Sequence, residues 1–269
     1  MVGNLLLRGM LVGLAAGLLC FVFLRVMGEP SIGGAIAFEE AGAATAPAFG
    51  HEHAAPAAGN EAVAEPAGHD HGGGEELVSR PTQAGLGLLT AVIVYGTALG
   101  GLFALAFALV YGRWETLGPR GTAALLAAAG FVALYLVPFF KYPPNPPAVG
   151  SPDTIGMRTS LYVAMLALSL AGMIAAAALR GRLVPSQGRW NASLCAGGTY
   201  LVGMLVVGVL LPGIHEIPEA FPAATLWSFR VASLGGQAIL WSTIGIGFGL
   251  LSHRVALREP GARLDVAVV

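Results

Sequence analysis

The chain has 269 residues, of which 55% are hydrophobic and only 11% are charged, and its mean hydropathy is +0.73. Soluble domains carry about a quarter charged residues, so this chain has too few charges for a water-exposed surface and is predicted to be an integral membrane protein. The formal net charge is −1 and no basic run is present, which argues against nucleic acid as a partner and leaves membrane lipid as the expected surroundings. Cys20 and Cys195 lie within apolar runs, which predicts buried thiols rather than a disulfide framework.

Six stretches without Asp, Glu, Lys or Arg are long enough, or nearly so, for the roughly 20 apolar residues that a membrane-spanning helix needs. Because the bilayer core offers no water to unpaired backbone groups, these stretches should be helical. The expected fold is all-α, a polytopic membrane helix bundle of about six transmembrane helices that forms one membrane domain over residues 1–269. The predicted spans are Gly9–Leu24, Pro81–Gly112, Gly121–Phe140, Thr159–Leu179, Trp190–Ile214 and Val231–Ser252.

Small residues recur at four-residue spacing in three of these spans. One stripe is Gly9, Gly13 and Gly17, and the other two are Gly96 with Gly100 and Gly245 with Gly249. Such stripes let helix backbones approach closely, so we interpret them as packing surfaces.

The distribution of Lys and Arg predicts the orientation. With a cytoplasmic N-terminus, nine basic residues fall in inner segments and five in outer ones, so both termini should be cytoplasmic. Cleavage of the first span as a signal peptide after "AIA" at Ala35–Ala37 is an alternative, although that site lies well beyond the apolar stretch. Either way, the segment after the first span lies outside.

That outer segment contains a polar insert, residues 41–80, rich in Ala, Gly, Pro and Glu. It has too few large apolar residues for their burial to offset the conformational entropy lost on ordering, so we expect it to be disordered. Four of the six histidines form two His-x-His pairs there, and each pair is next to a carboxylate, Glu52 or Asp70. Imidazoles bind cobalt, nickel, copper and zinc, and a His-rich tract of this kind predicts weak, reversible metal binding. A polar linker without metal is the alternative. The histidines are His51, His53, His69 and His71.

Two further outer segments are unusual. The stiff proline loop "KYPPNPPAVGSP" contains Asn145 and is followed by Asp153, and it could shape a pore mouth or simply connect two helices. The segment from Pro212 to Arg230 contains His215, Glu216 and Glu219. If it forms a helical turn, His215 and Glu219 share a face and could form a metal-binding mouth. An interfacial loop anchored by Trp227 is the alternative.

The last predicted span carries polar residues on one helical face. Arg230, Ser233, Gln237 and Trp241 recur at three- and four-residue spacing. Polar groups inside membrane helices usually face the bundle interior or a pathway, which makes Gln237 and Arg230 candidates for lining one. Hydrogen bonding between helices is the alternative.

Four stretches carry a family resemblance: "GEPSIGGAIAFEE", "QAGLGLLTAVIVYGTALGGLFALAFALVYGR", "LVPFFKYPPNPPAVGSPDTIGMRT" and "FPAATLWSFRVASLGGQAILW". In these the chain resembles the CbtA family, probable cobalt transporter subunits. The resemblance implies several membrane helices, a His-containing segment after the first, and cobalt uptake connected with cobalamin. It also implies a small one-span partner subunit with a His-rich end, CbtB, and a location in the bacterial inner membrane. Residues that fall on the family's pattern are Glu29, Glu39, Lys141, Pro143, Asn145, Pro146, Asp153, Glu219, Pro222, Trp227, Arg230 and Gln237.

The leading hypothesis is a transport subunit for a divalent transition metal, with Co²⁺ as the transported ion and no resident cofactor. The insert histidines would collect the ion, and Glu29, Glu39, Glu40, Glu216 and Glu219 would pass it on. There is no Walker A motif and only one lysine, so the chain should not hydrolyse ATP, and no nucleophile–base pair suggests an enzyme. A metal-binding scaffold or sensor, a metal exporter and a haem-bearing subunit remain alternatives, and a homo-oligomer stays open.

Overall fold

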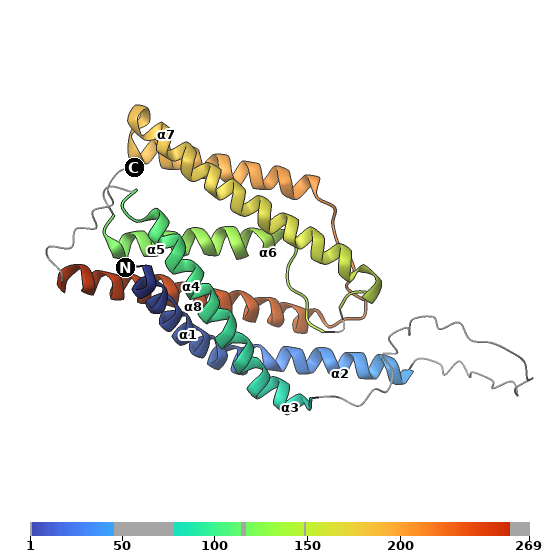
Figure 1. The fold of residues 1–269 in the computed structure, drawn as a ribbon. Coiled ribbons are helices and arrows are strands. Elements are labelled where there is room, and N and C mark those ends of the chain that lie inside the picture. The colour runs from blue at the N-terminus through green and yellow to red at the C-terminus, as the bar shows by residue number, and fades with distance from the viewer. Residues whose placement is uncertain (1, 46–77, 114–116, 148, 259–269) are drawn as a thin grey trace, which may run out of the picture.

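A computed structural model describes residues 2–45, 78–113, 117–147 and 149–258 of the chain. Within these residues every regular element is a helix (Figure 1), which confirms the predicted all-α fold. The elements are α1 (Val2–Met27), α2 (Glu29–Thr45), α3 (Arg80–Thr82), the π-helical turn η1 (Gln83–Gly87), α4 (Leu88–Val110), α5 (Pro119–Phe131), the π-helical turn η2 (Val132–Leu136), α6 (Val137–Lys141), the 3₁₀ turn η3 (Pro152–Thr154), α7 (Ile155–Leu210) and α8 (Ala223–Arg258).

Five helical segments in the described part of the chain are long and apolar enough to cross a membrane, and one of them holds two spans. That segment, Pro152–Leu210, is interrupted at Gly188, where φ is +75° and ψ is 168°. Figure 1 shows α7 folding back on itself as a hairpin of two antiparallel helices. The hydroxyls of Ser169 and Tyr200, one from each arm, lie 2.8 Å apart in a buried contact. The six predicted spans are therefore all present.

The first two predicted glycine stripes pack against each other between α1 and α4. Gly13 lies against Gly96, and Gly9 against Gly100, so closely that a Cβ atom at any of these positions would overlap backbone of the other helix. The absence of side chains thus lets two antiparallel helices meet backbone to backbone, as the stripes predicted.

Helix α8 is central to the bundle and packs against α1 and α5. Its Phe248 is fully buried, and the ring centroid lies 5.4 Å from that of Phe103 and 4.9 Å from that of Phe107, both in α4. Gly245 of the third stripe faces Ala127 of α5. The core therefore joins α8 to three other spans, whereas the α7 hairpin lies to one side and contacts the bundle mainly through η2 and α6.

Sequence analysis predicted no helix directly after the first span, but α2 is one. It begins with Glu29 and Pro30, an acidic residue and a proline in the first turn, which suit a helix N-terminus. It runs to Thr45, so residues 41–45 of the predicted insert belong to a helix. The four insert histidines lie outside the described residues, and the predicted disorder stays a prediction.

Candidate functional site at the insert end

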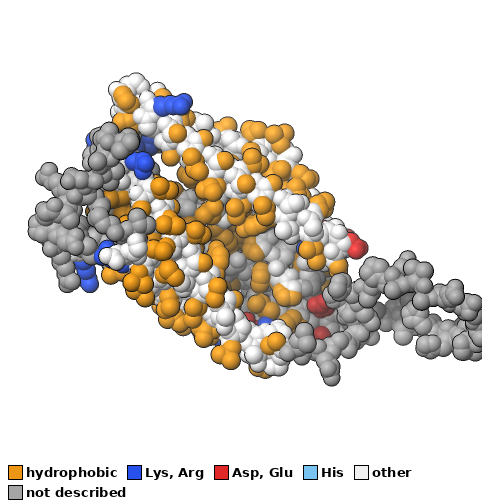
Figure 2. Space-filling model, in the orientation of Figure 1, with side chains coloured by type: hydrophobic (Ala, Val, Ile, Leu, Met, Phe, Trp, Pro, Cys, Tyr) orange, Lys and Arg blue, Asp and Glu red, His pale blue; other side chains and the backbone are white. Residues whose placement is uncertain are grey.

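The described carboxylates lie at one end of the bundle, whereas basic residues lie at both ends. At one end lie α2, residues 142–154 and residues 211–222, and we call this the insert end because α2 and α3 flank the insert there. The opposite end, where α1 begins and α8 finishes, is called the arginine end (Figures 1 and 2). The insert end holds every carboxylate of the described residues, namely Glu29, Glu39, Glu40, Asp153, Glu216 and Glu219. The arginine end holds Arg8, Arg113, Arg120, Arg180, Arg182, Arg189 and Arg254.

The carboxylates of α2 differ in their partners. Glu29 forms an ion pair with Arg80 at 2.7 Å, so the start of α2 and the start of α3 are tied together. Glu39 and Glu40, more than two turns further along α2, are exposed. The residue Arg80 was not singled out from the sequence, because nothing local connects it to a glutamate 51 positions away.

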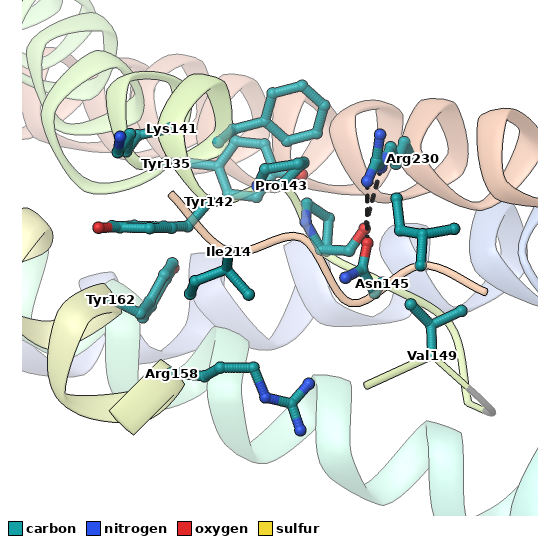
Figure 3. A pocket seen from close by; sticks show the side chains of 13 residues that line it. Tyr135, Lys141, Tyr142, Pro143, Asn145, Val149, Arg158, Tyr162, Ile214 and Arg230 are labelled. Carbon is teal, nitrogen blue, oxygen red and sulfur yellow. Dashed lines mark hydrogen bonds between the residues drawn. The ribbon is translucent and has the colours of Figure 1, made fainter. Parts of the chain in front are cut away.

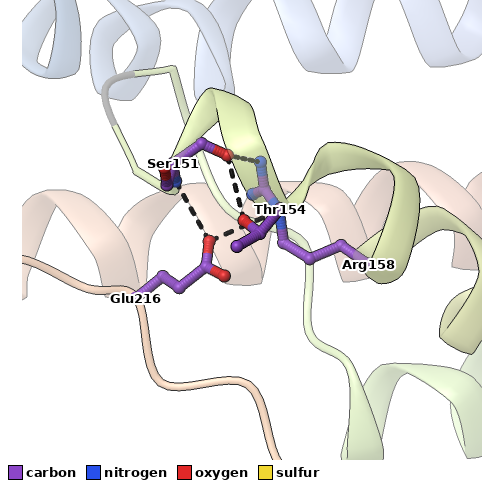
Figure 4. A network of polar contacts seen from close by, with 4 residues as sticks. All are labelled: Ser151, Thr154, Arg158 and Glu216. Carbon is purple, nitrogen blue, oxygen red and sulfur yellow. Dashed lines mark hydrogen bonds and ion pairs between the residues drawn. The ribbon is translucent and has the colours of Figure 1, made fainter.

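Glu216 is held by the segment that leads into α7 (Figure 4). Its Oε2 accepts a hydrogen bond from the backbone N–H of Ser151 at 3.1 Å and lies 3.4 Å from Nε of Arg158. The hydroxyl of Thr154 lies within hydrogen-bonding reach of the same carboxylate. This hydroxyl, with smaller contributions from Ser151 and Arg158, holds the pKa of Glu216 below its ordinary value of 4.5, against the opposing effect of partial burial.

His215 and Glu219 do not share a helical face. Residues 211–222 form an extended loop rather than a helical turn, because Pro212, Pro218 and Pro222 interrupt any helical hydrogen-bond pattern. Both His215 and Glu219 are exposed, as is Asp153 in η3. The sequence-based suggestion of a helical metal-binding mouth is therefore wrong in its geometry, although the two side chains remain accessible at the insert end.

The proline loop packs onto α8 through Arg230. Nη2 of Arg230 donates to Oδ1 of Asn145 at 2.9 Å, and its Nε donates to the carbonyl of Pro144 at 3.4 Å (Figure 3). The hydroxyl of Tyr142 donates to the carbonyl of Pro212 at 2.8 Å, which links the loop to the end of α7. Burial raises the pKa of this phenol, so it stays a neutral donor.

A cavity of about 400 Å³ opens beneath these contacts. Its lining comes from α6, the proline loop, α7, the loop after α7 and α8, and includes Lys141, Arg158 and Tyr162 beside Arg230 and Asn145 (Figure 3). Sequence analysis did not single out Arg158 or Tyr162, since each is one polar residue near the start of a long apolar helix.

The polar face of α8 exists as predicted. Ser233 and Tyr135 hydroxyls lie 2.9 Å apart, and Trp241 packs against Gly130. Oε1 of Gln237 is buried and has no hydrogen-bond partner among the described residues. Helix–helix hydrogen bonding, the alternative role given to this residue, is thus not made by that oxygen.

A complete metal site is not found in the described part of the chain, which contains no group of three or more His, Cys, Asp or Glu side chains placed to hold an ion. Cys20 is buried, as expected, and its thiol donates to the carbonyl of Gly236 at 3.6 Å. Cys195 is exposed on α7, contrary to the prediction, because the apolar run that contains it is an outward-facing membrane helix.

Taken together, these features define a multi-pass membrane protein in which one end bears the insert and all the described carboxylates, and the other end is rich in arginine. The sequence model of the CbtA family, probable cobalt transporter subunit, matches residues 2–253. The chain therefore belongs to the CbtA family. No curated protein matches the chain, and no solved structure does.

Proposed function

We propose that the chain is the multi-pass subunit that carries Co²⁺ into the cell, in uptake that supplies cobalamin synthesis. The proposal rests on one observation in a chain of the CbtA family: all six described carboxylates gather at the end that bears the His-rich insert. Carboxylate oxygens and imidazole nitrogens together suit a divalent first-row metal ion.

The insert end faces the outside in this proposal. Seven described arginines lie at the opposite end, and positively charged segments stay on the cytoplasmic side of a bacterial inner membrane. Helix α1 begins and α8 ends at that arginine end (Figure 1), which agrees with an even number of spans and two cytoplasmic termini.

Capture starts at the insert histidines and at Glu39 and Glu40. His51 is six positions after Thr45, the end of α2, and six residues span at most about 20 Å. Because five helical residues rise about 8 Å, His51 and His53 can return to the exposed carboxylates of α2. Two imidazoles and a carboxylate would then share an ion that no described cluster holds alone.

His215 and Glu219 provide a second exposed pair at the same end, beside the bundle. Glu29 and Glu216 each have an arginine partner, so an ion would have to displace Arg80 or Arg158 to bind them. We therefore propose Glu39, Glu40, His215 and Glu219 as primary contacts, and Glu29 and Glu216 as secondary ones. Beyond them, Gln237 would line the path between helices, since its Oε1 is a buried oxygen with no hydrogen-bond donor among the described residues.

A partner would complete the transporter. The described residues contain no group of three or more ligands placed to hold an ion, and a small one-span subunit with a His-rich end would add imidazoles at the insert end. Assembly of several copies of this chain is a second way to bring such groups together.

The test measures ⁵⁷Co²⁺ accumulation in cells that lack other cobalt importers. The chain is expressed alone and with the candidate one-span partner, and its presence in the membrane is checked in both cases. Uptake in either case supports the proposal and shows whether the partner is needed. Faster loss of preloaded cobalt would instead show an exporter. Binding to the membrane fraction without flux in sealed vesicles would show a scaffold or sensor.

A further inference from the structure

The spans pack around two separate hydrophobic cores. The first core joins α1, α4, α5 and α8 and includes the fully buried Phe248. The second lies within the α7 hairpin, where Met165 of the first arm belongs to one buried cluster with Tyr200 and Met204 of the second arm. Because each core holds its own helices together, the protein consists of two packed units. We call them the four-helix body (α1, α4, α5 and α8) and the hairpin body (α7).

The helix that runs from α5 through η2 to α6 joins the two bodies. Phe131 and Leu134 pack against the core of the four-helix body, whereas Val132 and Val137 pack against the core of the hairpin body. Helix α7 makes its contacts with the other helices mainly through η2 and α6. The turn η2 therefore lies at the junction of the two bodies.

The junction is not a regular α-helical turn. The N–H of Val137 donates to the carbonyl of Val132, five residues back instead of four. Pro138 follows directly; it has no N–H to give to the carbonyl of Leu134, and its ring would clash with that carbonyl in a regular helix, which accounts for the wider turn. Prolines and π-helical turns are places where helices bend, so η2 has the geometry of a hinge.

The cavity of about 400 Å³ at the insert end lies between the two bodies. Arg230 of α8 lines it from the four-helix body, and Arg158 and Tyr162 of α7 line it from the hairpin body (Figure 3). Protein interiors are close-packed, and a void leaves the atoms around it without contacts on one side. A movement between the bodies at this position therefore breaks few packing contacts.

Polar contacts to α8 border the cavity. The hydroxyl of Tyr135 in η2 lies 2.9 Å from that of Ser233 in α8, at the junction itself. Nearer the insert end, Arg230 donates to Oδ1 of Asn145 at 2.9 Å. The proline loop that contains Asn145 connects α6 to the start of α7, so this contact holds the hairpin body against α8. A small apolar cluster at the same end adds to the closure and includes Ala35, Val149 and Phe221.

We propose that the hairpin body moves as a rigid unit about η2, and that the contact between Arg230 and Asn145 is the clasp that keeps the cavity closed at the insert end. Release of the clasp lets the start of α7 swing relative to α8 and changes the width of the cavity, while both hydrophobic cores stay intact. Hinge movements of this kind are confined to a few residues at the ends of rigid elements. The device is independent of the cobalt proposal, since it is defined by distances within the protein.

The movement is measured from distances between paired spin labels in the purified full chain in detergent, without metal. Labels are attached to cysteines introduced at exposed positions, after Cys20 and Cys195 have been replaced by alanine. One pair reports the distance between the bodies, and two control pairs each lie within one body. The three pairs are Ile174→Cys with Ile246→Cys between α7 and α8, Ile174→Cys with Val202→Cys within the hairpin, and Leu102→Cys with Ile246→Cys within the four-helix body.

Asn145→Ala removes the acceptor of the clasp. It should raise the population of a second distance between α7 and α8 about tenfold, because Arg230 loses a charge-assisted hydrogen bond, and it should leave both control pairs unchanged. Asn145→Asp keeps an oxygen acceptor for Arg230 and should behave as wild type. Pro138→Ala, added to Asn145→Ala, permits a regular helical bond to the carbonyl of Leu134 and should reduce the second population, because the hinge is stiffer.

Three outcomes would overturn the proposal. The first is a distance between α7 and α8 that is the same in wild type and Asn145→Ala, which would show that Arg230 and Asn145 form no clasp. The second is an equal change in the pair within the hairpin, which would show that α7 does not move as a unit. The third is a second population that Pro138→Ala leaves undiminished, which would show that the hinge is not at η2.

Discussion

The carboxylate of Glu29 and the guanidinium of Arg80 lie 2.7 Å apart, although 51 positions of sequence separate them. The pair fixes the first residue of α2 against the first residue of α3, and so brings together the two helices that flank the insert. The side chain of Glu29 is only 10% exposed and that of Arg80 is 32% exposed. Arg80, the last residue of the insert, is therefore tied to the start of α2.

Breaking this pair should cost little stability but should impair capture. In Glu29→Gln or Arg80→Gln, we expect a loss of about 1 kcal/mol or less, since the arginine is partly exposed to solvent. The ⁵⁷Co²⁺ concentration for half-maximal uptake should rise, because Arg80, where the insert ends, is no longer tied to the start of α2. The double exchange Glu29→Arg with Arg80→Glu serves as the rescue. Unchanged uptake in all three variants would show that the anchor has no part in capture.

The insert histidines should set the affinity of uptake rather than its maximum rate. Alanine at His51, His53, His69 and His71 should raise the cobalt concentration needed for half-maximal uptake without abolishing transport, because Glu39, Glu40 and the pathway remain. Wild-type capture should weaken as pH falls through about 6.5, since imidazole must be neutral to bind metal. This pH step should be smaller in the tetra-alanine variant, which keeps only His215 among the proposed imidazole ligands. Complete loss of transport, with the protein present in the membrane, would refute a collecting role.

The sequence predicted the six spans because hydropathy and the absence of charge report membrane burial directly. It missed α2, because "EPSIGGAIAFEEAGAAT" contains Glu29, Glu39 and Glu40 and is therefore not a charge-free apolar stretch of the kind that predicts a span. That helix is placed by tertiary contacts, such as the edge-to-face packing of Phe38 on Phe221 with ring centroids 5.1 Å apart.

The polar pairs at the insert end could not be predicted in the same way. Arg230 and Asn145 are 85 positions apart, and Glu216 and Arg158 belong to separate segments that meet only when the spans pack. The sequence identified Asn145, Glu216 and Arg230 as unusual polar residues at one membrane surface. It could not reveal that Glu216 already has an arginine partner, because local spacing carries no information on which loops pack together.

Glu216 should stabilise the protein at neutral pH and not in acid. Its folded-state pKa lies below the ordinary value of 4.5, so its contribution is fully present above about pH 4.5 and is lost as pH falls through the lower folded-state pKa. Glu216→Gln should therefore unfold at a lower temperature than wild type at pH 7, and the difference should shrink as pH falls through the lowered folded-state pKa of Glu216. Glu219→Gln is the control, because Glu219 is exposed. A difference that persists unchanged into acid would contradict the contacts of the ionised carboxylate with Thr154, Ser151 and Arg158 as its cause.

The contact between α1 and α4 should not tolerate side chains. Gly13→Ala places a methyl group against the backbone of Gly96, which is rigid, so we expect destabilisation of about 1–3 kcal/mol in detergent-induced unfolding. Gly203→Ala is the matched control, since a Cβ at that helical position meets nothing within 4 Å. There, alanine should be neutral or slightly stabilising because it is the better helix former. Equal behaviour of the two variants would mean that α1 and α4 are not in backbone contact.

The buried amide of Gln237 should lower the stability of the protein and support transport. An unpaired buried amide oxygen costs about 1–3 kcal/mol, so Gln237→Leu should leave the protein as stable as wild type or more so. If the oxygen lines the cobalt path, the same change should lower the ⁵⁷Co²⁺ uptake rate.

Thr97→Val is the matched control, because Oγ1 of Thr97 is also buried without a hydrogen-bond partner among the described residues, yet we place it off the path. It should resemble Gln237→Leu in stability and wild type in transport. Loss of stability in Gln237→Leu would show that the amide makes a needed contact, and retained transport would remove Gln237 from the pathway.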